Sequence, residues 1–365
     1  MSDIFSAVQL GEFDLRNRIV MAPMTRDRAG PGDVPTAIMA DYYRQRAGAG
    51  LIVTEGTQPS ASGKGYYRTP GIHTDAQVEG WRAVAEGVHA AGGRIVLQLM
   101  HCGRASVRAN KVSDAETIAP SAIPCPDTIP GPDGVPRETD PPRALATGEI
   151  ASVVAEYAAA AANARRAGLD GVELHCASGY LPMQFLSSNS NQRNDRYGGT
   201  VENRIRFAVE TLEALANAIG PGRVGFRICP GVILNGMADR DPAQTYTALL
   251  SAVDPLRLAY VHLIHIPLAG VDALDLVHAS WTGPVIENNN LTLERATAAL
   301  AEARADAVSF GRSFVSNPDL VERFRVGAPL AKLDRQTLYT GHGDDRRGYV
   351  DYPALGDAPA RSSDG

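Results

Sequence analysis

The chain has 365 residues, 44% of them hydrophobic, and a formal net charge of −6 at pH 7. This length can bury a large core, and an α/β barrel of this size often forms one unit. The acidic balance does not favour phosphate backbones or anionic lipid surfaces, so we expect no nucleic-acid and no membrane partner. No run of eighteen apolar residues occurs, and the N-terminus lacks a basic segment followed by an apolar one, so neither a membrane span nor a secretory signal is predicted.

Eight short β-branched runs alternate with eight alanine-rich helical patterns along the chain. The runs that predict strands are 18–22, 50–55, 93–99, 170–175, 223–228, 258–265, 283–287 and 306–311. The patterns that predict helices are 36–47, 75–91, 149–167, 200–219, 242–253, about 272–279, 292–304 and 317–325. Continuous apolar strands alternating with helices indicate parallel strands, and their closed arrangement is an α/β fold, the (β/α)8 TIM barrel. A doubly wound open sheet is the alternative; the strand count and the lack of a G-x-G-x-x-G after the first strand favour the barrel.

We expect a single domain over residues 1–365, with three additions to the barrel. The segment 103–146 is rich in Pro, Gly and charge and follows the third strand, so we expect a long excursion over the active-site face. The stretch VQLGEFDLRNR near the N-terminus predicts a hairpin that closes the opposite mouth. Residues 354–365 are predicted to form a flexible tail.

Cysteine usage indicates the compartment. No C-x-x-C spacing relates the four cysteines, which are Cys102, Cys125, Cys176 and Cys229. A chain of this size does not need disulfides, so a reducing, cytoplasmic setting is expected.

Polar residues and glycines gather where the predicted strands end, and barrels build their active sites at those ends. They are Pro23, Met24, Thr25 and Arg26; Glu55, Gly56 and Thr57; Gln98, Met100 and His101; His175, Ser178 and Tyr180; Arg227; the run 287–290; and Gly311 and Arg312. Gly311 and Arg312, with the loop after the seventh strand, fit the phosphate site that barrels often form from their last two loops. These positions predict a phosphorylated, planar, hydrogen-bonding cofactor. A salt bridge from Arg227 to a barrel carboxylate is an equal alternative for that residue.

Three other site chemistries find little support. His262 and His265 are three residues apart in a strand, so their side chains face opposite sides and cannot chelate together; we expect no metal. Ser178 does not lie in a G-x-S-x-G elbow, which argues against a serine hydrolase. The three lysines, Lys64, Lys111 and Lys332, do not end predicted strands, which argues against Schiff-base chemistry.

The chain resembles the Old Yellow Enzyme family of FMN-dependent ene-reductases, which are (β/α)8 barrels. The motifs that carry the resemblance run nearly end to end: LRNRIVMAPMTR (15–26), YYRQRAGAGLIVTEGTQ (42–58), GYYRTPGIHTDAQVEGWRAV (65–84), GGRIVLQLMHCGR (92–104), AGLDGVELHCASGYLPMQFLS (167–187), NQRNDRYGGTVENRIRF (191–207), DAVSFGRSFVSNPDL (306–320) and GYVDYP (348–353). Each motif is weak alone, but their joint order and spacing are highly specific.

The resemblance implies a role for each matching position. Thr25 would bond the flavin C4 carbonyl, Gln98 the pyrimidine edge, and Arg227 would lie by N1 and C2=O, where a cation stabilises reduced flavin. The remaining cofactor contacts would come from Pro23, Met24, Gly56, Asn289, Gly311 and Arg312, the last offering a guanidinium fork to the phosphate.

The same resemblance implies the substrate chemistry. His175 would donate a hydrogen bond to the carbonyl or nitro oxygen of an activated alkene, and Tyr180 would protonate the α-carbon as general acid. Tyr66, Met100 and Tyr349 would line the substrate pocket. NAD(P)H would deliver hydride to the flavin and leave before the small-molecule alkene binds over the same face.

Three positions depart from the family pattern. Ser178 stands where the family usually has His or Asn. The shorter serine side chain would reach the substrate oxygen less well as the second hydrogen-bond donor. Met100 stands where Trp is usual, and the run 287–291, ENNNL, replaces a glycine-rich loop. Losing one donor would cost about 1–3 kcal/mol. Small cyclic enones are therefore expected to be poor substrates.

The primary sequence interpretation is an NAD(P)H-dependent ene-reductase. Two alternatives remain: a flavin-dependent desaturase or alkene isomerase acting on a specialised metabolite, and a flavin redox sensor that does not turn over. The substrate, the choice between NADH and NADPH, and whether the protein is a monomer or a homodimer are not determined by the sequence.

Overall fold

The computed structural model describes residues 3–111, 114–266, 272–339 and 343–356. Within these ranges, eight parallel strands form a closed barrel. In chain order they are β3 (Ile19–Met21), β4 (Leu51–Val53), β5 (Ile95–Leu99), β10 (Gly171–Cys176), β11 (Val224–Ile228), β12 (Tyr260–Ile264), β13 (Val285–Asn288) and β14 (Ala307–Phe310). Pairing of β14 with β3, Val308 opposite Ile19, closes the barrel. The predicted strands and their closed order are confirmed.

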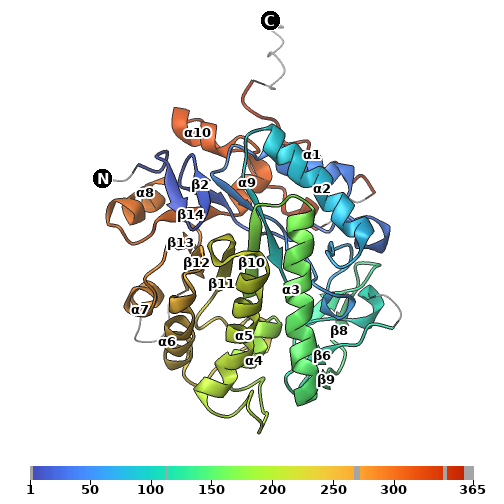
Figure 1. Cartoon of the computed structure of the whole chain (residues 1–365). Helices are drawn as coiled ribbons and strands as arrows, with labels where there is room; N and C mark the ends of the chain where they lie inside the picture. The colour runs from blue at the N-terminus through green and yellow to red at the C-terminus, as the bar shows by residue number, and fades with distance from the viewer. Residues whose placement is uncertain (1–2, 112–113, 267–271, 340–342, 357–365) are drawn as a thin grey trace, which may run out of the picture.

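Helices surround the barrel in the described part of the chain (Figure 1). They are α1 (Ala37–Gln45), α2 (Asp75–Ala90), α3 (Ile150–Arg166), α5 (Val201–Ile219), α6 (Pro242–Val253), α7 (Ala273–Ser280), α8 (Leu293–Ala301) and α10 (Leu320–Val326). Each corresponds to a predicted helix. Thr74 begins α2 with a capping box and the Thr200 hydroxyl begins α5 by accepting from the Asn203 amide, so local side chains fix where these helices start.

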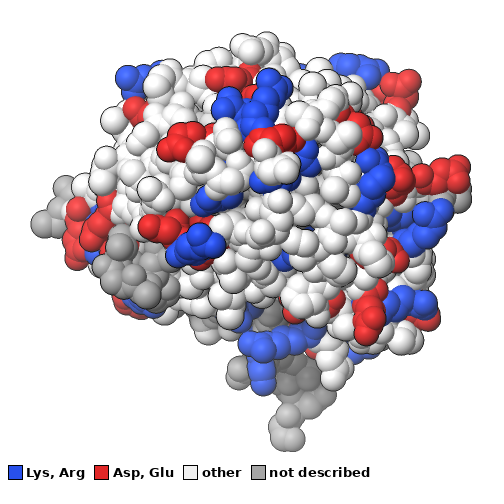
Figure 2. Space-filling model, turned by 90° about the horizontal axis from the view of Figure 1, so that it is seen from below, with Lys and Arg blue, Asp and Glu red and all other residues white. Residues whose placement is uncertain are grey.

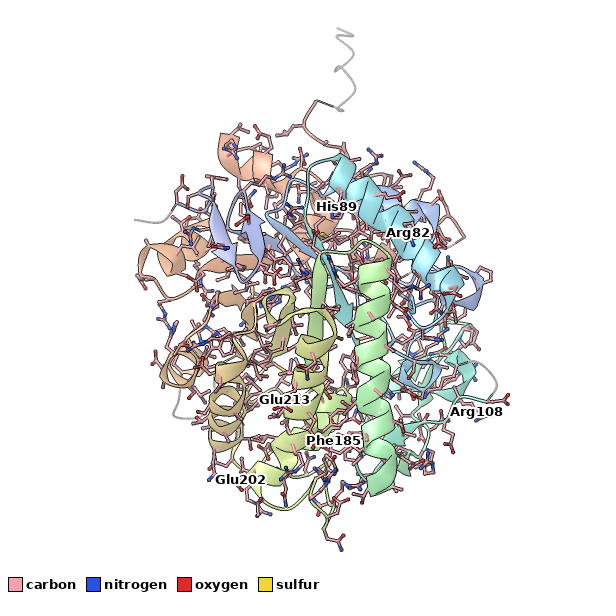
Figure 3. All side chains as sticks on the ribbon, in the orientation of Figure 1. Arg82, His89, Arg108, Phe185, Glu202 and Glu213 are labelled. Atoms are coloured by element: carbon pink, nitrogen blue, oxygen red, sulfur yellow. The ribbon has the colours of Figure 1, made fainter. Side chains whose placement is uncertain are left out.

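Two short helices were not predicted, and both follow strand ends that carry candidate site residues. They are α4 (Leu181–Leu186), directly after Tyr180, and α9 (Arg312–Ser316), directly after Gly311. Phe185 of α4 stacks on Phe207 of α5 with ring centroids 4.3 Å apart, and Figure 3 shows Phe185 where the two helices meet. This packing anchors α4, which begins directly after Tyr180.

A two-stranded hairpin closes the N-terminal end of the barrel, as predicted. It consists of β1 (Val8–Leu10) and β2 (Phe13–Leu15). Leu10, Phe13 and Leu15 pack against the barrel interior, forming one buried cluster with residues such as Val20 and Tyr260. Gly11 turns the hairpin at φ +57°, where a Cβ would lie 2.5 Å from the Gly222 carbonyl oxygen, so this position requires glycine.

The connection from β5 to α3 carries four short strands: β6 (Ile118–Ala119), β7 (Thr128–Pro130), β8 (Pro136–Glu138) and β9 (Arg143–Ala144). Strands β7 and β8 form an antiparallel hairpin, while β6 pairs with β9 in parallel. Figure 1 shows this connection beside α3. Its hairpin turn contributes to a cavity described below.

The surface seen in Figure 2 mixes charges of both signs. Lys and Arg side chains lie among Asp and Glu side chains on this face, without a broad region of one sign. No helix within the described residues is long and apolar enough to cross a membrane. Of the predicted tail, residues 357–365 lie outside the described residues.

Candidate flavin and substrate site

Two cavities lie at the C-terminal ends of the barrel strands. The first, of about 400 Å³, is lined by Ala22, Pro23, Met24, Arg227, Asn288, Asn289, Asn290, Leu291, Ser309, Phe310, Gly311, Arg312 and Ser313. The second, of about 790 Å³, is lined by Thr25, Asp27, Tyr66, Tyr67, Arg68, the residues 130–134, Tyr180 and Tyr339. We call them the cofactor cavity and the substrate cavity. They adjoin along the segment after β3, because Met24 lines one and Thr25 lines the other.

Arg227 is the buried cation of the cofactor cavity. It lies on β11 and is 7% exposed, and its Nη2 donates to Asn288 Oδ1 at 2.8 Å. Burial lowers the pKa of the guanidinium, although Glu173 acts in the opposite direction. The Nε atom is buried and has no hydrogen-bond partner in the part of the chain that the structure describes. Arg227 thus brings a buried cation with one unpartnered donor to this strand end, and its contact with a flavin stays a prediction.

Loop residues at the other end of the cofactor cavity supply donors for an anionic group. Arg312 donates to Asn290 Oδ1, and Asn289 is tied to the loop after β12 through the His265 carbonyl oxygen. Gly311 lies close to Met24, since a Cβ on this glycine would lie 3.2 Å from the Met24 Sδ. The cavity lining thus holds two guanidinium groups, those of Arg312 and of the buried Arg227, which suit a phosphorylated molecule with a polar ring such as FMN.

A fully hydrogen-bonded network, the floor, lies in the barrel beneath the cofactor cavity. Gln98 Nε2 donates to Glu173 Oε1 at 2.8 Å, His262 Nδ1 lies 2.9 Å from Glu173 Oε2, and His262 Nε2 lies 2.8 Å from Ser309 Oγ. Burial opposes ionisation of Glu173, but the adjacent His262 and Arg227 hold its pKa below the usual value. Burial also lowers the pKa of His262, so the pair is a carboxylate beside a neutral ring. The network fixes the amide of Gln98.

His175, near the end of β10, and Tyr180, which follows the strand, lie side by side. Their ring centroids are 5.0 Å apart at an interplanar angle of 65°. Burial, with the charge of Arg227, lowers the pKa of His175 to about 3, so the ring is neutral at physiological pH. Its Nδ1 is buried without a partner among the described residues. The structure therefore brings together the two side chains predicted to polarise and protonate a substrate.

Tyr180 is hydrogen-bonded to a second phenol. Its hydroxyl donates to the Tyr66 hydroxyl at 3.1 Å, with the two rings edge to face. Burial, reinforced by the neighbouring Tyr66, raises the pKa of Tyr180 well above its ordinary value. Burial likewise raises the pKa of Tyr66, with Cys102 adding to the shift. Both phenols are protonated at neutral pH, and both line the substrate cavity.

Ser178 occupies a left-handed turn between these two side chains. Its φ is +56°, a conformation that Asn adopts more readily than Ser. Its backbone N–H donates to Cys229 Sγ at 3.0 Å, and its carbonyl accepts from Asn235 Nδ2 at 2.8 Å. The hydroxyl also hydrogen-bonds Cys229. The hydroxyl is thus engaged with the β11 side of the turn.

Two predicted substrate contacts are placed differently. Tyr349 is 0% exposed and stacks on Tyr42 at 4.1 Å, with the guanidinium of Arg26 over both rings. The prediction that Tyr349 lines the pocket is therefore wrong; this cation–π packing holds it in the core, and Tyr339, 61% exposed, lines the cavity instead. Met100 is 4% exposed and packs on Gly56, where a Cβ would lie 2.5 Å from its Sδ.

Several residues of the site were not foreseen. Asp27, Tyr67, Arg68, Tyr339 and the turn 130–134 line the substrate cavity, and the Asn288 side chain holds Arg227. The sequence did contain an indication for Asn288, since this residue lies in the ENNN run at the end of a predicted strand. Asp27 had one too, because it follows Thr25 by two residues. No group of three or more His, Cys, Asp or Glu side chains in the described ranges could hold a metal ion.

The barrel carries two adjoining cavities at its C-terminal face, one of them with donors suited to FMN. Residues 3–331 match the NADH:flavin oxidoreductase / NADH oxidase family. The chain is 40% identical to a probable flavin mononucleotide-dependent alkene reductase of Leishmania infantum, over 95% of this chain and 96% of that protein. It is 38% identical to 12-oxophytodienoate reductase 7 of Oryza sativa subsp. japonica, with 98% and 96% covered.

Solved structures agree. Morphinone reductase in complex with tetrahydroNAD superimposes with a TM-score of 0.92 at 42% identity, covering 99% of this chain and 100% of that one. The chain belongs to the Old Yellow Enzyme family of flavin oxidoreductases, and the resemblance noted from its motifs is confirmed.

Proposed function

We propose that this protein reduces the activated C=C bond of α,β-unsaturated carbonyl or nitro compounds, with FMN as cofactor and NAD(P)H as hydride donor. The observation that carries the proposal is the His175–Tyr180 pair: Tyr180 lines the substrate cavity, and His175 pairs across the sheet with Arg227, which lines the cavity with donors suited to FMN. The relatives named as alkene and oxophytodienoate reductases support the reaction class.

The cofactor would be held by residues from six strand ends. Arg312, Gly311 and Asn289 would bind the phosphate, Arg227 and Gln98 the pyrimidine edge, while Thr25 would bond C4=O and Pro23, Met24 and Gly56 would contribute backbone. When bound, FMN accepts a hydride from NAD(P)H and returns it to the alkene. Arg227 contributes a fixed positive charge where negative charge develops, which requires no reorganisation at the moment of reaction.

His175 polarises the substrate. A neutral imidazole carries one N–H, and donating it to the carbonyl or nitro oxygen withdraws electron density from the alkene. The low pKa keeps the ring neutral throughout the physiological range. Ser178 is the proposed second donor, and its engagement with Cys229 supports the expectation that its contribution is weak.

Tyr180 supplies the proton. Its hydroxyl transfers a proton to the α-carbon while hydride arrives at the β-carbon. The Tyr66 hydroxyl, 3.1 Å away, can then donate a hydrogen bond to the phenolate oxygen of Tyr180. A phenol pair thus delivers a proton from groups that stay protonated at neutral pH.

We also propose a single domain with the 103–146 excursion over the active-site face, a cytoplasmic location, and a monomeric or homodimeric state. The contribution of residues 130–134 to the substrate cavity supports the first proposal. All four cysteines are free and buried, which supports a reducing compartment.

The test is the visible spectrum of purified holoprotein under nitrogen. Addition of NADPH or NADH is expected to bleach the flavin absorbance, and a later addition of an enone is expected to restore it with formation of the saturated ketone. A flavin that stays oxidised for many minutes would indicate a redox sensor. An isomerised or desaturated product would indicate the other flavin chemistry, and a protein that binds no FMN would overturn the proposal.

A further inference from the structure

The substrate cavity combines aromatic walls with charged residues that differ in their partners. Four tyrosines line it: Tyr66, Tyr67, Tyr180 and Tyr339. Arg68 donates to both carboxylate oxygens of Asp345, at 2.8 and 2.6 Å, and Asp133 accepts from Arg137 at 2.6 Å. The charges of these two lining residues are therefore already neutralised by ion pairs.

Asp27 is different. Its Oδ1 is inaccessible to solvent and accepts no hydrogen bond from the residues that the structure describes. Burial, with the nearby carboxyl of Glu55, raises the pKa of Asp27 to about 8, although Arg28, Arg68 and Arg26 act in the opposite direction. The residue as a whole is partly exposed, so one oxygen of this carboxyl is buried without a hydrogen bond, which is costly, and a cationic ligand in the cavity would stabilise the ionised form.

Asp27 lines the substrate cavity and not the cofactor cavity. Met24 lines the cofactor cavity, Thr25 lies where the two cavities adjoin, and Asp27 lines only the substrate cavity. A substrate with its alkene beside Tyr180 therefore has room to extend toward Asp27. The cavity of about 790 Å³ is larger than a small cyclic enone needs.

A carboxyl group within walls of aromatic rings can recognise an alkylammonium group, because ring faces attract cations and the carboxyl, ionised by the cation beside it, balances the positive charge. We propose that Asp27 and the surrounding tyrosines form a subsite for a tertiary or quaternary ammonium group carried by the alkene substrate. This inference rests on the proposed reductase function and names its substrate class.

A matched pair of substrates tests the subsite. One is an enone with a trimethylammonium-alkyl substituent, and the other is its neutral tert-butyl-alkyl isostere. The ratio of kcat/KM for the cationic over the neutral enone is expected to be at least about tenfold in the wild-type holoprotein. In Asp27→Asn it should fall close to one. Asp133→Asn is the control, because it removes a carboxylate of the same cavity that already has a partner.

A ratio near one in the wild type, or a ratio that Asp27→Asn leaves unchanged, would overturn the proposal. FMN content and circular dichroism of each variant show whether it is folded and loaded. Titration with the saturated ammonium ketone, followed by the flavin spectrum, separates the two hypotheses. If neither enone is reduced but this ketone binds at least tenfold more tightly to the wild type than to Asp27→Asn, the reductase function fails and the ammonium subsite stands.

Discussion

The floor network and the C-terminal end of the barrel, here called the mouth, differ in how their polar atoms are hydrogen-bonded. On the floor, Gln98, Glu173 and His262 form a chain of hydrogen bonds of 2.8 to 2.9 Å. At the mouth, His175 Nδ1, Arg227 Nε and Asp27 Oδ1 are buried without partners among the described residues. Native proteins pair most of their buried polar groups, and exceptions call for an explanation. The floor therefore serves stability and orientation, while the mouth serves ligands.

Tyr180→Phe, at the mouth, has the largest expected effect and tests whether the mouth serves the reaction. Loss of the general acid is expected to slow enone reduction by about 10²- to 10⁴-fold. Reduction of the flavin by NADPH, which needs no such proton, should change only a few-fold. Stopped-flow measurement of the two half-reactions separates them.

Tyr246→Phe is the control, because it likewise removes one phenolic hydroxyl, but from α6, where Tyr246 Oη is buried without a partner in the described chain. Equal slowing of both half-reactions in Tyr180→Phe would contradict its assignment as acid.

Glu173→Gln tests the floor. The change removes one partner of a buried charged network, so the free energy of unfolding should fall by about 2 to 3 kcal/mol. His175→Asn at the mouth should cost far less, because the ring nitrogen it removes has no partner to lose. Chemical denaturation of both apoproteins gives the two values, and similar losses would remove the distinction between floor and mouth.

Ser178→Asn is expected to raise the rate with 2-cyclohexenone about tenfold by restoring a second donor to the substrate oxygen. Asn also suits the backbone at φ +56°, so the variant should be at least as stable as the wild type. Ser178→His shares the donor, and Ser178→Ala is the control without one. Steady-state turnover that is the same for all four proteins would show that serine is not limiting.

The smallest expected effect is on the pH dependence of stability. Folding raises the pKa of Asp27 to about 8, so the folded state holds its proton more tightly than the unfolded chain. The stabilisation from this proton is complete below the unfolded pKa near 4 and is lost as the pH rises toward 8. The Asp27→Asn variant has no carboxyl at this position, so its stability does not fall with pH for this reason.

The Tm of Asp27→Asn minus that of the wild type should therefore increase by about 2 °C or more from pH 5 to pH 9. Differential scanning calorimetry of the apoproteins measures it, and a constant difference would show that Asp27 has an ordinary pKa.

Local sequence patterns predicted the barrel and placed the site at the C-terminal ends of its strands. They could do so because apolar periodicity and helix capping depend on residues close together in the sequence. They placed His175, Tyr180, Arg227 and Gly311 at strand ends, and the structure brings those ends together. Tyr349 was misplaced because its stacking on Tyr42 depends on a contact between residues about 300 positions apart. Asp27 was missed for a related reason: only the three-dimensional packing shows which carboxyl has no partner.

Asn235 connects three loops that are distant in sequence. Its Nδ2 donates to the Ser178 carbonyl, its backbone N–H donates to Asp127 of the excursion, and its side chain hydrogen-bonds Tyr66. Asn235 thus couples the 103–146 excursion to the turn at Ser178, so protein engineering should exchange the two together. A chimera that takes residues 103–146 from a relative should take the loop around Asn235 with them, since the graft otherwise changes the turn it is meant to leave intact.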